Sequence, residues 1–186
     1  AYATRLPYAA QTYANVPERV ISVAWLRMKD DTRGFHSMMA IPAELSLRRT
    51  PDGIRLAFQP VRELDAMRGE PLFLPRRSDS AEFPLADTPC ELLFCCKPNQ
   101  LLTLTIGDTV LTAENSRLHI QPVLGQDAVD AHLDVNEPIR VILDRGAIEV
   151  FANGGTFWAA LEAEGDLLTK TISIAGAEGL KVYPLH

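Results

Sequence analysis

The sequence lacks the residue patterns that build metal and nucleotide sites. It has three cysteines in 186 residues, none in a CxxC spacing. Cys95 and Cys96 are adjacent and cannot easily bridge each other. We therefore expect Cys90, Cys95 and Cys96 to be buried or reduced thiols rather than zinc ligands. The four histidines are scattered, and the glycines are isolated rather than arranged as GxGxxG or a P-loop. No metal and no cofactor is predicted.

Other absences narrow the range of partners. No apolar run reaches the roughly 20 residues of a membrane helix, and the first residues lack the charged and apolar regions of a signal peptide. The net charge is −6, with acidic and basic residues interspersed rather than clustered, which argues against nucleic acid. We expect a neutral partner, no nucleic acid and no membrane. The compartment stays open between cytoplasm and secretion.

Alternation with period two dominates what the sequence does contain. In the stretch from residue 102 to 106, leucine and isoleucine alternate with threonine, as expected for strands. Turn-forming residues recur at short spacing: Pro51 to Gly53, Gly107-Asp108, Asn153 to Gly155 and Glu164 to Asp166. The predicted fold class is all-β, an antiparallel two-sheet β-sandwich preceded by a hairpin unit.

A short helical pattern interrupts the strands between Pro60 and Gly69, where Val61 and Leu64 recur at helical spacing. We interpret it as a connector and place a domain boundary near residue 70. Residues 70–186 have the length of a complete sandwich. Residues 1–69 are short for an independent all-β core and are predicted to be an incomplete unit.

Two carboxylates, Asp144 and Glu149, flank a predicted turn at Arg145-Gly146 in "IRVILDRGAIEVFANGG". A retaining glycosidase needs two carboxyl groups about 5 to 5.5 Å apart. Strand alternation explains both residues equally well, and Arg140 lies close by. A solvated ion-pair cluster is therefore favoured over an active site.

Aromatic residues gather in the N-terminal hairpin, where exposed rings would be able to stack on a sugar face. Tyr8 and Trp25 are positioned to emerge together at one end of the paired strands. Core packing is the alternative, and the residues alone favour it. No GxSxG or similar nucleophile motif accompanies any histidine.

Three stretches carry a family resemblance. "YAAQTYANVPERVISVAWLRM" resembles the segment that opens the last blade of the five-bladed propeller in glycoside hydrolase family 32, which includes invertases, levanases and inulinases. "IPAELSLRRTPDGIRLAFQPVRELDAMRG" resembles the next stretch of that family's sequence, and residues 139–155 resemble its sandwich signature. Residues 71–138 agree only in strand pattern and length.

The resemblance implies a retaining β-fructosidase for sucrose, levan or inulin linkages, with two catalytic aspartates and a glutamate. Their motifs, a "WMNDPNG"-like run, "RDP" and "EC", do not occur in this sequence, and Cys90-Glu91 is the reverse order. We thus expect a C-terminal piece of such an enzyme, either prepared as a fragment or carried as a shortened gene product. It would have no catalytic residue of its own and be inactive alone.

By the same resemblance, Tyr8 and Trp25 match a tyrosine and a tryptophan that line the sugar pocket. Leu6-Pro7 and Ala24 depart from the family pattern around them. Asp144 and Glu149 match residues that are structural in the family.

The expected partners are a fructose-containing saccharide and the propeller domain of the parent enzyme. We expect the apolar residues of the first hairpin, Ile21, Val23 and Leu26, to fold back on the sandwich or to pair with a second copy in a homo-oligomer. The alternative function is a stand-alone carbohydrate-binding sandwich.

Overall fold

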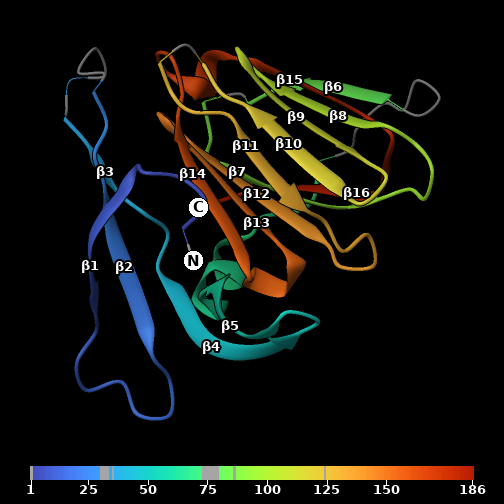
Figure 1. Ribbon diagram of the computed structural model, residues 1–186. Helices are drawn as coiled ribbons and strands as arrows, with labels where there is room; N and C mark the ends of the chain where they lie inside the picture. The colour runs from blue at the N-terminus through green and yellow to red at the C-terminus, as the bar shows by residue number, and fades with distance from the viewer. Residues whose placement is uncertain (1, 30–33, 35, 73–79, 86, 124) are drawn as a thin grey trace.

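The computed structural model describes residues 2–29, 34, 36–72, 80–85, 87–123 and 125–186. Its N-terminal part is an antiparallel sheet with the order β1-β2-β4-β5, and a short strand, β3, pairs with β2 (Figure 1). The strands are β1 (Pro7–Thr12), β2 (Ile21–Leu26), β3 (Met38–Met39), β4 (Ala43–Thr50) and β5 (Gly53–Pro60). A 3-10 helix, η1 (Arg62–Met67), comes after this N-terminal sheet, within the stretch where a short helical pattern was predicted. Its role as a connector between domains stays a prediction.

Two further antiparallel sheets form the sandwich. The six-stranded sheet has the order β11-β10-β9-β8-β15-β6 and the five-stranded sheet the order β14-β13-β12-β7-β16. The first contains β6 (Ser80–Pro84), β8 (Leu102–Ile106), β9 (Thr109–Glu114), β10 (Arg117–Gln121), β11 (Val129–His132) and β15 (Thr171–Ala175). The second contains β7 (Cys90–Cys96), β12 (Ile139–Asp144), β13 (Ala147–Ala152), β14 (Phe157–Glu162) and β16 (Ala177–Pro184). Two short 3-10 helices, η2 (Asn153–Gly155) and η3 (Leu167–Thr169), lie between strands. The predicted all-β fold class is confirmed.

The alternation read from the sequence sorts side chains between the core and the surface. Leu102, Leu104 and Ile106 are buried between the two sheets, whereas Thr103 and Thr105 are only half-buried. This face-by-face sorting is what a period of two produces in a strand. The predicted turns also join the expected strands, with residues 51–52 between β4 and β5 and residues 107–108 between β8 and β9.

The five-stranded sheet is covered on its outer face as well. Phe151 and Trp158 from this sheet pack in a second cluster with Leu26, Phe58 and Leu64 of the N-terminal part. Leu26 is fully buried there, so the expectation that the first hairpin folds back on the sandwich is confirmed for Leu26. Ile21 is buried outside this cluster, and Val23 is only half-buried. Figure 1 shows the N-terminal sheet lying beside and below β13 and β14. Pairing with a second copy stays a prediction.

Residues 2–4 cover the edge strand β14. Tyr2 forms a parallel bridge with Trp158, and the Ala3 N–H donates to the Trp158 carbonyl at 2.8 Å. Thr4 exchanges two hydrogen bonds with the backbone of Ala160, since its hydroxyl donates to the carbonyl at 2.7 Å and accepts from the N–H at 3.1 Å. An edge strand with paired backbone groups is protected from pairing with other chains.

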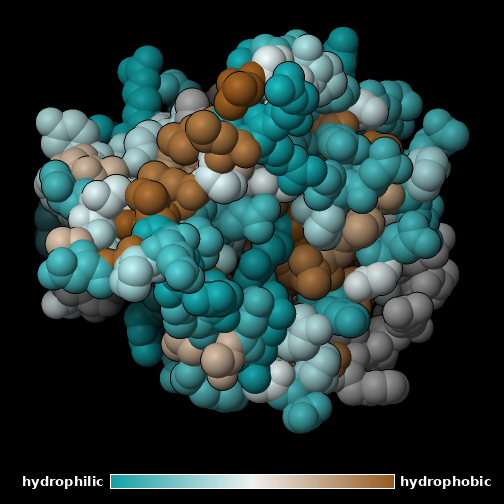
Figure 2. Space-filling model, turned by 90° about the horizontal axis from the view of Figure 1, so that it is seen from below, coloured by the Kyte–Doolittle hydropathy of each residue, from teal (hydrophilic) through white to brown (hydrophobic). Residues whose placement is uncertain are grey.

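Some apolar side chains of the N-terminal sheet remain exposed. They are Met39 on β3, Leu47 on β4, and Ile54 and Leu56 on β5. Figure 2 views the molecule from below, the side on which β4 and β5 lie in Figure 1, and shows hydrophobic side chains exposed among hydrophilic ones.

The three cysteines are free thiols; Cys90 and Cys96 are buried and Cys95 is half-buried. Burial raises the pKa of Cys90 to about 12, which leaves it as an unreactive thiol at neutral pH. Among the described residues, no helix is long and apolar enough to span a membrane.

Candidate functional site

Tyr8 and Trp25 face each other across the first hairpin. They are register partners in β1 and β2, and their ring centroids are 6.4 Å apart with an edge-to-face angle of 65°. Tyr8 is 54% exposed and Trp25 is 40% exposed. Core packing is therefore wrong for both residues, because the inward face of β2 is formed instead by Ala24 and Leu26.

A guanidinium group extends this aromatic pair. The Arg27 Cζ atom lies 4.3 Å from the centroid of the Tyr8 ring, close enough for a cation–π contact. A terminal nitrogen of Arg27 also donates to the Arg5 carbonyl at 2.9 Å, which fixes the guanidinium over the ring. Met39 lies opposite Trp25 on β3 and is exposed. The pair thus presents two rings and a cation to solvent, a combination that can stack on and hydrogen-bond to a sugar.

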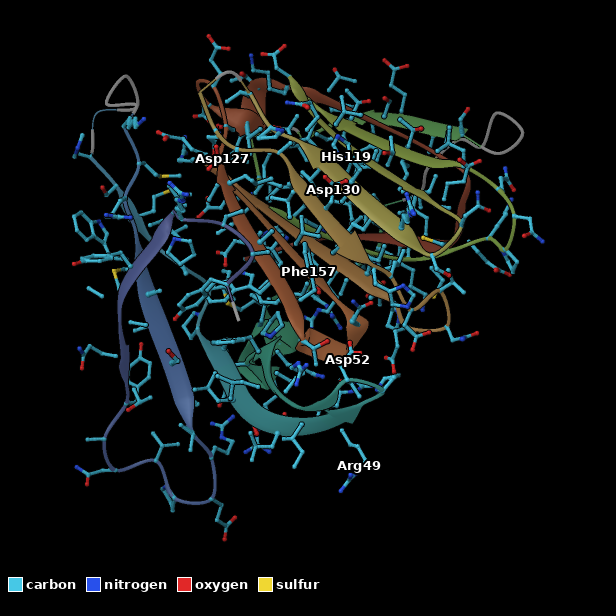
Figure 3. All side chains as sticks on the ribbon, viewed as in Figure 1. Arg49, Asp52, His119, Asp127, Asp130 and Phe157 are labelled. Carbon is cyan, nitrogen blue, oxygen red and sulfur yellow. The ribbon has the colours of Figure 1, made fainter. Side chains whose placement is uncertain are left out.

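A groove lies next to the aromatic pair, between the N-terminal segment and one end of the sandwich. Arg5, Arg27 and Lys29 line one wall, and Gln126 and Asp127 line the other. Figure 3 labels Asp127 at the upper left edge of the sandwich. Arg27 is common to the two features, because it lines the groove and its guanidinium group lies over the Tyr8 ring.

The pair Asp144 and Glu149 is not arranged as a catalytic site. Arg145 and Gly146 form the predicted turn between β12 and β13, but Glu149 is 3% exposed and lies between the sandwich and the N-terminal part. Its carboxyl group accepts hydrogen bonds from the Ile41 N–H at 2.8 Å and the Trp158 indole N–H at 3.1 Å. The expectation of a solvated ion-pair cluster is therefore wrong for Glu149. The sheet face that carries it is covered by a distant segment of the chain.

Another carboxylate on the same sheet face is compensated by two arginines. Glu91 is fully buried and accepts from Arg68 Nε at 2.6 Å and from Arg140 Nε at 2.5 Å. Asp65 in the connector contacts both guanidinium groups, at 2.9 Å and 3.2 Å. This network ties η1 to strands β7 and β12, and the hydrogen bond to Glu91 raises the pKa of Arg68.

Sequence reasoning missed this buried acidic face. Glu91, Glu149 and Glu162 are all buried and all stand inside strands of the five-stranded sheet. The signal was present, because each glutamate is surrounded by apolar residues in "CELLFCC", "AIEVFA" and "FWAALE". A glutamate within an apolar strand indicates a covered face with polar partners rather than a solvated edge.

Comparisons with known proteins show which of them share this architecture. No family model matches the chain. It is similar to the sucrose-6-phosphate hydrolase of Vibrio alginolyticus, with 25% identity over 196 aligned positions that cover 96% of this chain and 38% of that protein.

Solved structures agree with this result. The exo-inulinase from Aspergillus awamori matches with a TM-score of 0.76 and 14% identity, over 99% of this chain and 44% of that one. A glycoside hydrolase family 32 protein from Bifidobacterium adolescentis matches with a TM-score of 0.75 and 20% identity, over 97% and 32%. The chain thus spans less than half the length of each of these three proteins. Its expected resemblance to the C-terminal part of glycoside hydrolase family 32 is thereby confirmed.

Proposed function

We propose that this chain is the non-catalytic C-terminal part of a family 32 β-fructosidase, where it supports the catalytic propeller. The observation that carries the proposal is the coverage, since nearly all of this chain matches only a third to a half of each solved structure. The aspartate and glutamate motifs of the family do not occur in this sequence. Because glycoside hydrolysis of this type requires two carboxyl groups across one sugar, the chain alone does not hydrolyse its substrate.

The substrate of the whole enzyme is a fructose-containing saccharide. The N-terminal sheet is the last blade of the propeller, and Tyr8 and Trp25 form part of the wall of its sugar pocket. Support comes from the exposure of both rings on the sheet face that points away from the sandwich, where they are free to contact a sugar. The sandwich, residues 70–186, holds this blade through the second apolar cluster and the Glu91 network.

Fructose release tests the proposal. The chain alone, and the longer product encoded together with its upstream coding region, are assayed with sucrose, inulin and levan. We expect release only from the longer product. Hydrolysis by the chain alone would contradict the non-catalytic assignment.

The role of the aromatic pair is tested in the longer product. Tyr8→Ala and Trp25→Ala should each lower kcat/KM about tenfold, the loss expected for about 1.4 kcal/mol of stacking. Tyr13→Ala is the matched control, because Tyr13 is an exposed tyrosine next to the same strand. Equal effects of all three substitutions would contradict a pocket role for Tyr8 and Trp25.

Isothermal titration of the chain alone with inulin and levan oligomers separates this proposal from a stand-alone binding module. A supporting part gives no heat in the millimolar range, because one blade supplies only a fragment of the pocket wall. Saturable heat that Trp25→Ala abolishes would favour the binding module instead.

A further inference from the structure

Four acidic residues share the covered face of the five-stranded sheet. Glu149 lies opposite Ile142 on β12, and Ile142 lies opposite Glu91 on β7. One row further along, Ala147 has Asp144 on one side and Glu162 on the other. Residues two positions apart in a strand point to the same side of a sheet. Glu149 therefore faces the N-terminal part together with the carboxyl groups of Glu91, Asp144 and Glu162.

Among the described residues, the arginines at this face contact Glu91 and not Glu149. Arg68 and Arg140 both contact Glu91 through their Nε atoms. Glu162 accepts the backbone N–H of Lys29 at 2.8 Å. Among the contacts of the described residues, Glu149 has only two uncharged donors, the Ile41 N–H and the Trp158 indole.

A buried carboxyl group without a cation is costly to ionise. Desolvation disfavours the charged form, and the nearby charge of Asp144 disfavours it further. The two hydrogen bonds act in the opposite direction but do not balance the burial, and the pKa of Glu149 is raised to about 8. Burial likewise raises the pKa of Asp144.

We propose that the Glu149 carboxyl group is a pH-sensitive latch between the N-terminal sheet and the sandwich. In its neutral form it holds the segment at Ile41 against β13 and β14. When it ionises, an uncompensated charge lies in the apolar interface, and the carboxylate gains by reaching water. The N-terminal sheet then loosens from the sandwich.

The segment held by the latch also flanks the aromatic pair. Ala40 precedes Ile41 and donates its N–H to the Ala24 carbonyl at 2.8 Å, and Met39 is the register partner of Trp25. Ionisation of Glu149 therefore releases the backbone that lies directly beside the strand of Trp25. The latch couples pH to the placement of this strand, whether or not the surface binds a saccharide.

The direction of the pH effect is set by linkage. The pKa of Glu149 is higher in the folded chain than the ordinary 4.5, so its stabilising contribution is complete below about pH 4.5 and is lost as pH rises through about 8. Replacement by glutamine keeps the shape of the group and removes its titration. Urea unfolding of the wild-type chain and of Glu149→Gln from pH 5 to pH 9 measures the difference directly.

We expect the unfolding equilibrium constant of the wild type, relative to Glu149→Gln, to rise at least about tenfold between pH 6 and pH 9, which corresponds to one or more pKa units of linkage. Glu164→Gln is the matched control, because Glu164 is exposed at the end of the same sheet. It should behave like the wild type. A parallel pH dependence of wild type and Glu149→Gln would overturn the proposal.

A second measurement covers the case in which Glu149→Gln does not fold. We expect the infrared spectrum of the Asp144→Asn variant to contain a band from a buried protonated carboxyl group at pH 6, and we expect this band to be absent at pH 9. Asp144→Asn removes the neighbouring carboxyl that would otherwise contribute to this spectrum. Absence of such a band at pH 6 would overturn the proposal as well.

Discussion

Trp158 packs against residues of both the sandwich and the N-terminal part. It is 2% exposed and stacks on Phe151 with ring centroids 5.6 Å apart. It also contacts Phe58 at 5.3 Å and Tyr2 at 5.0 Å, both from the N-terminal part. Its indole N–H is one of two donors to Glu149. A single side chain thus serves the apolar cluster and the buried carboxyl group together.

These contacts determine the cost of Trp158→Ala. Replacing a buried tryptophan by alanine lowers the free energy of unfolding by about 3–5 kcal/mol. Leaving the Glu149 carboxyl group without one of its donors adds to this cost. We therefore expect the free energy of unfolding to fall by about 5 kcal/mol. For a chain of this size each kcal/mol lowers Tm by about 2–4 °C. We therefore expect Tm to fall by about 10–20 °C.

Thermal and urea unfolding monitored by circular dichroism measure this loss. Trp25→Ala is the matched control, since Trp25 is the other tryptophan of the chain and is exposed. It should change the free energy of unfolding by less than about 1 kcal/mol. Equal losses for the two variants would refute the reasoning. The reasoning would also be refuted if Trp158→Ala left a single, unchanged unfolding transition of the sandwich and only made proteolysis of the N-terminal sheet faster.

Two further substitutions test the interface at other points. Arg68→Ala leaves Glu91 buried with one of its two guanidinium partners, so we expect the free energy of unfolding, measured with urea, to fall by about 3–5 kcal/mol. A decrease below about 1 kcal/mol would show that Arg140 alone compensates the charge. Gly155→Ala should destabilise the chain by more than Gly165→Ala. Both glycines have positive φ, but a Cβ at Gly155 would lie 2.5 Å from the Phe58 carbonyl oxygen, whereas a Cβ at Gly165 would meet no heavy atom within 4 Å. Equal unfolding midpoints for the two variants would contradict the close approach.

Local physics made much of the sandwich predictable. Period-two alternation places Leu102, Leu104 and Ile106 on one face of a strand, and glycine-containing turns fix where strands end. Both signals act over a few residues and survive in any tertiary context. The same logic predicted the turn between Asp144 and Glu149.

The covering of a sheet face is not a local property. Alternation assigned Glu149 to the outer face correctly but could not reveal that Ile41 and Trp158 enclose it. The exposure of Tyr8 and Trp25 was equally undecidable, because an aromatic residue fits both a core and a surface. The covering of Glu149 depends on a contact between residues more than 100 positions apart, Ile41 with Glu149. The boundary near residue 70 stays a prediction of composition and length.

The coding sequence immediately upstream of Ala1 tests the central claim most directly. If the chain supports a family 32 propeller, that sequence encodes, in frame, the two aspartate motifs and the glutamate-cysteine pair. An initiator codon with none of these motifs before it would contradict the account and make a free-standing sandwich the better description.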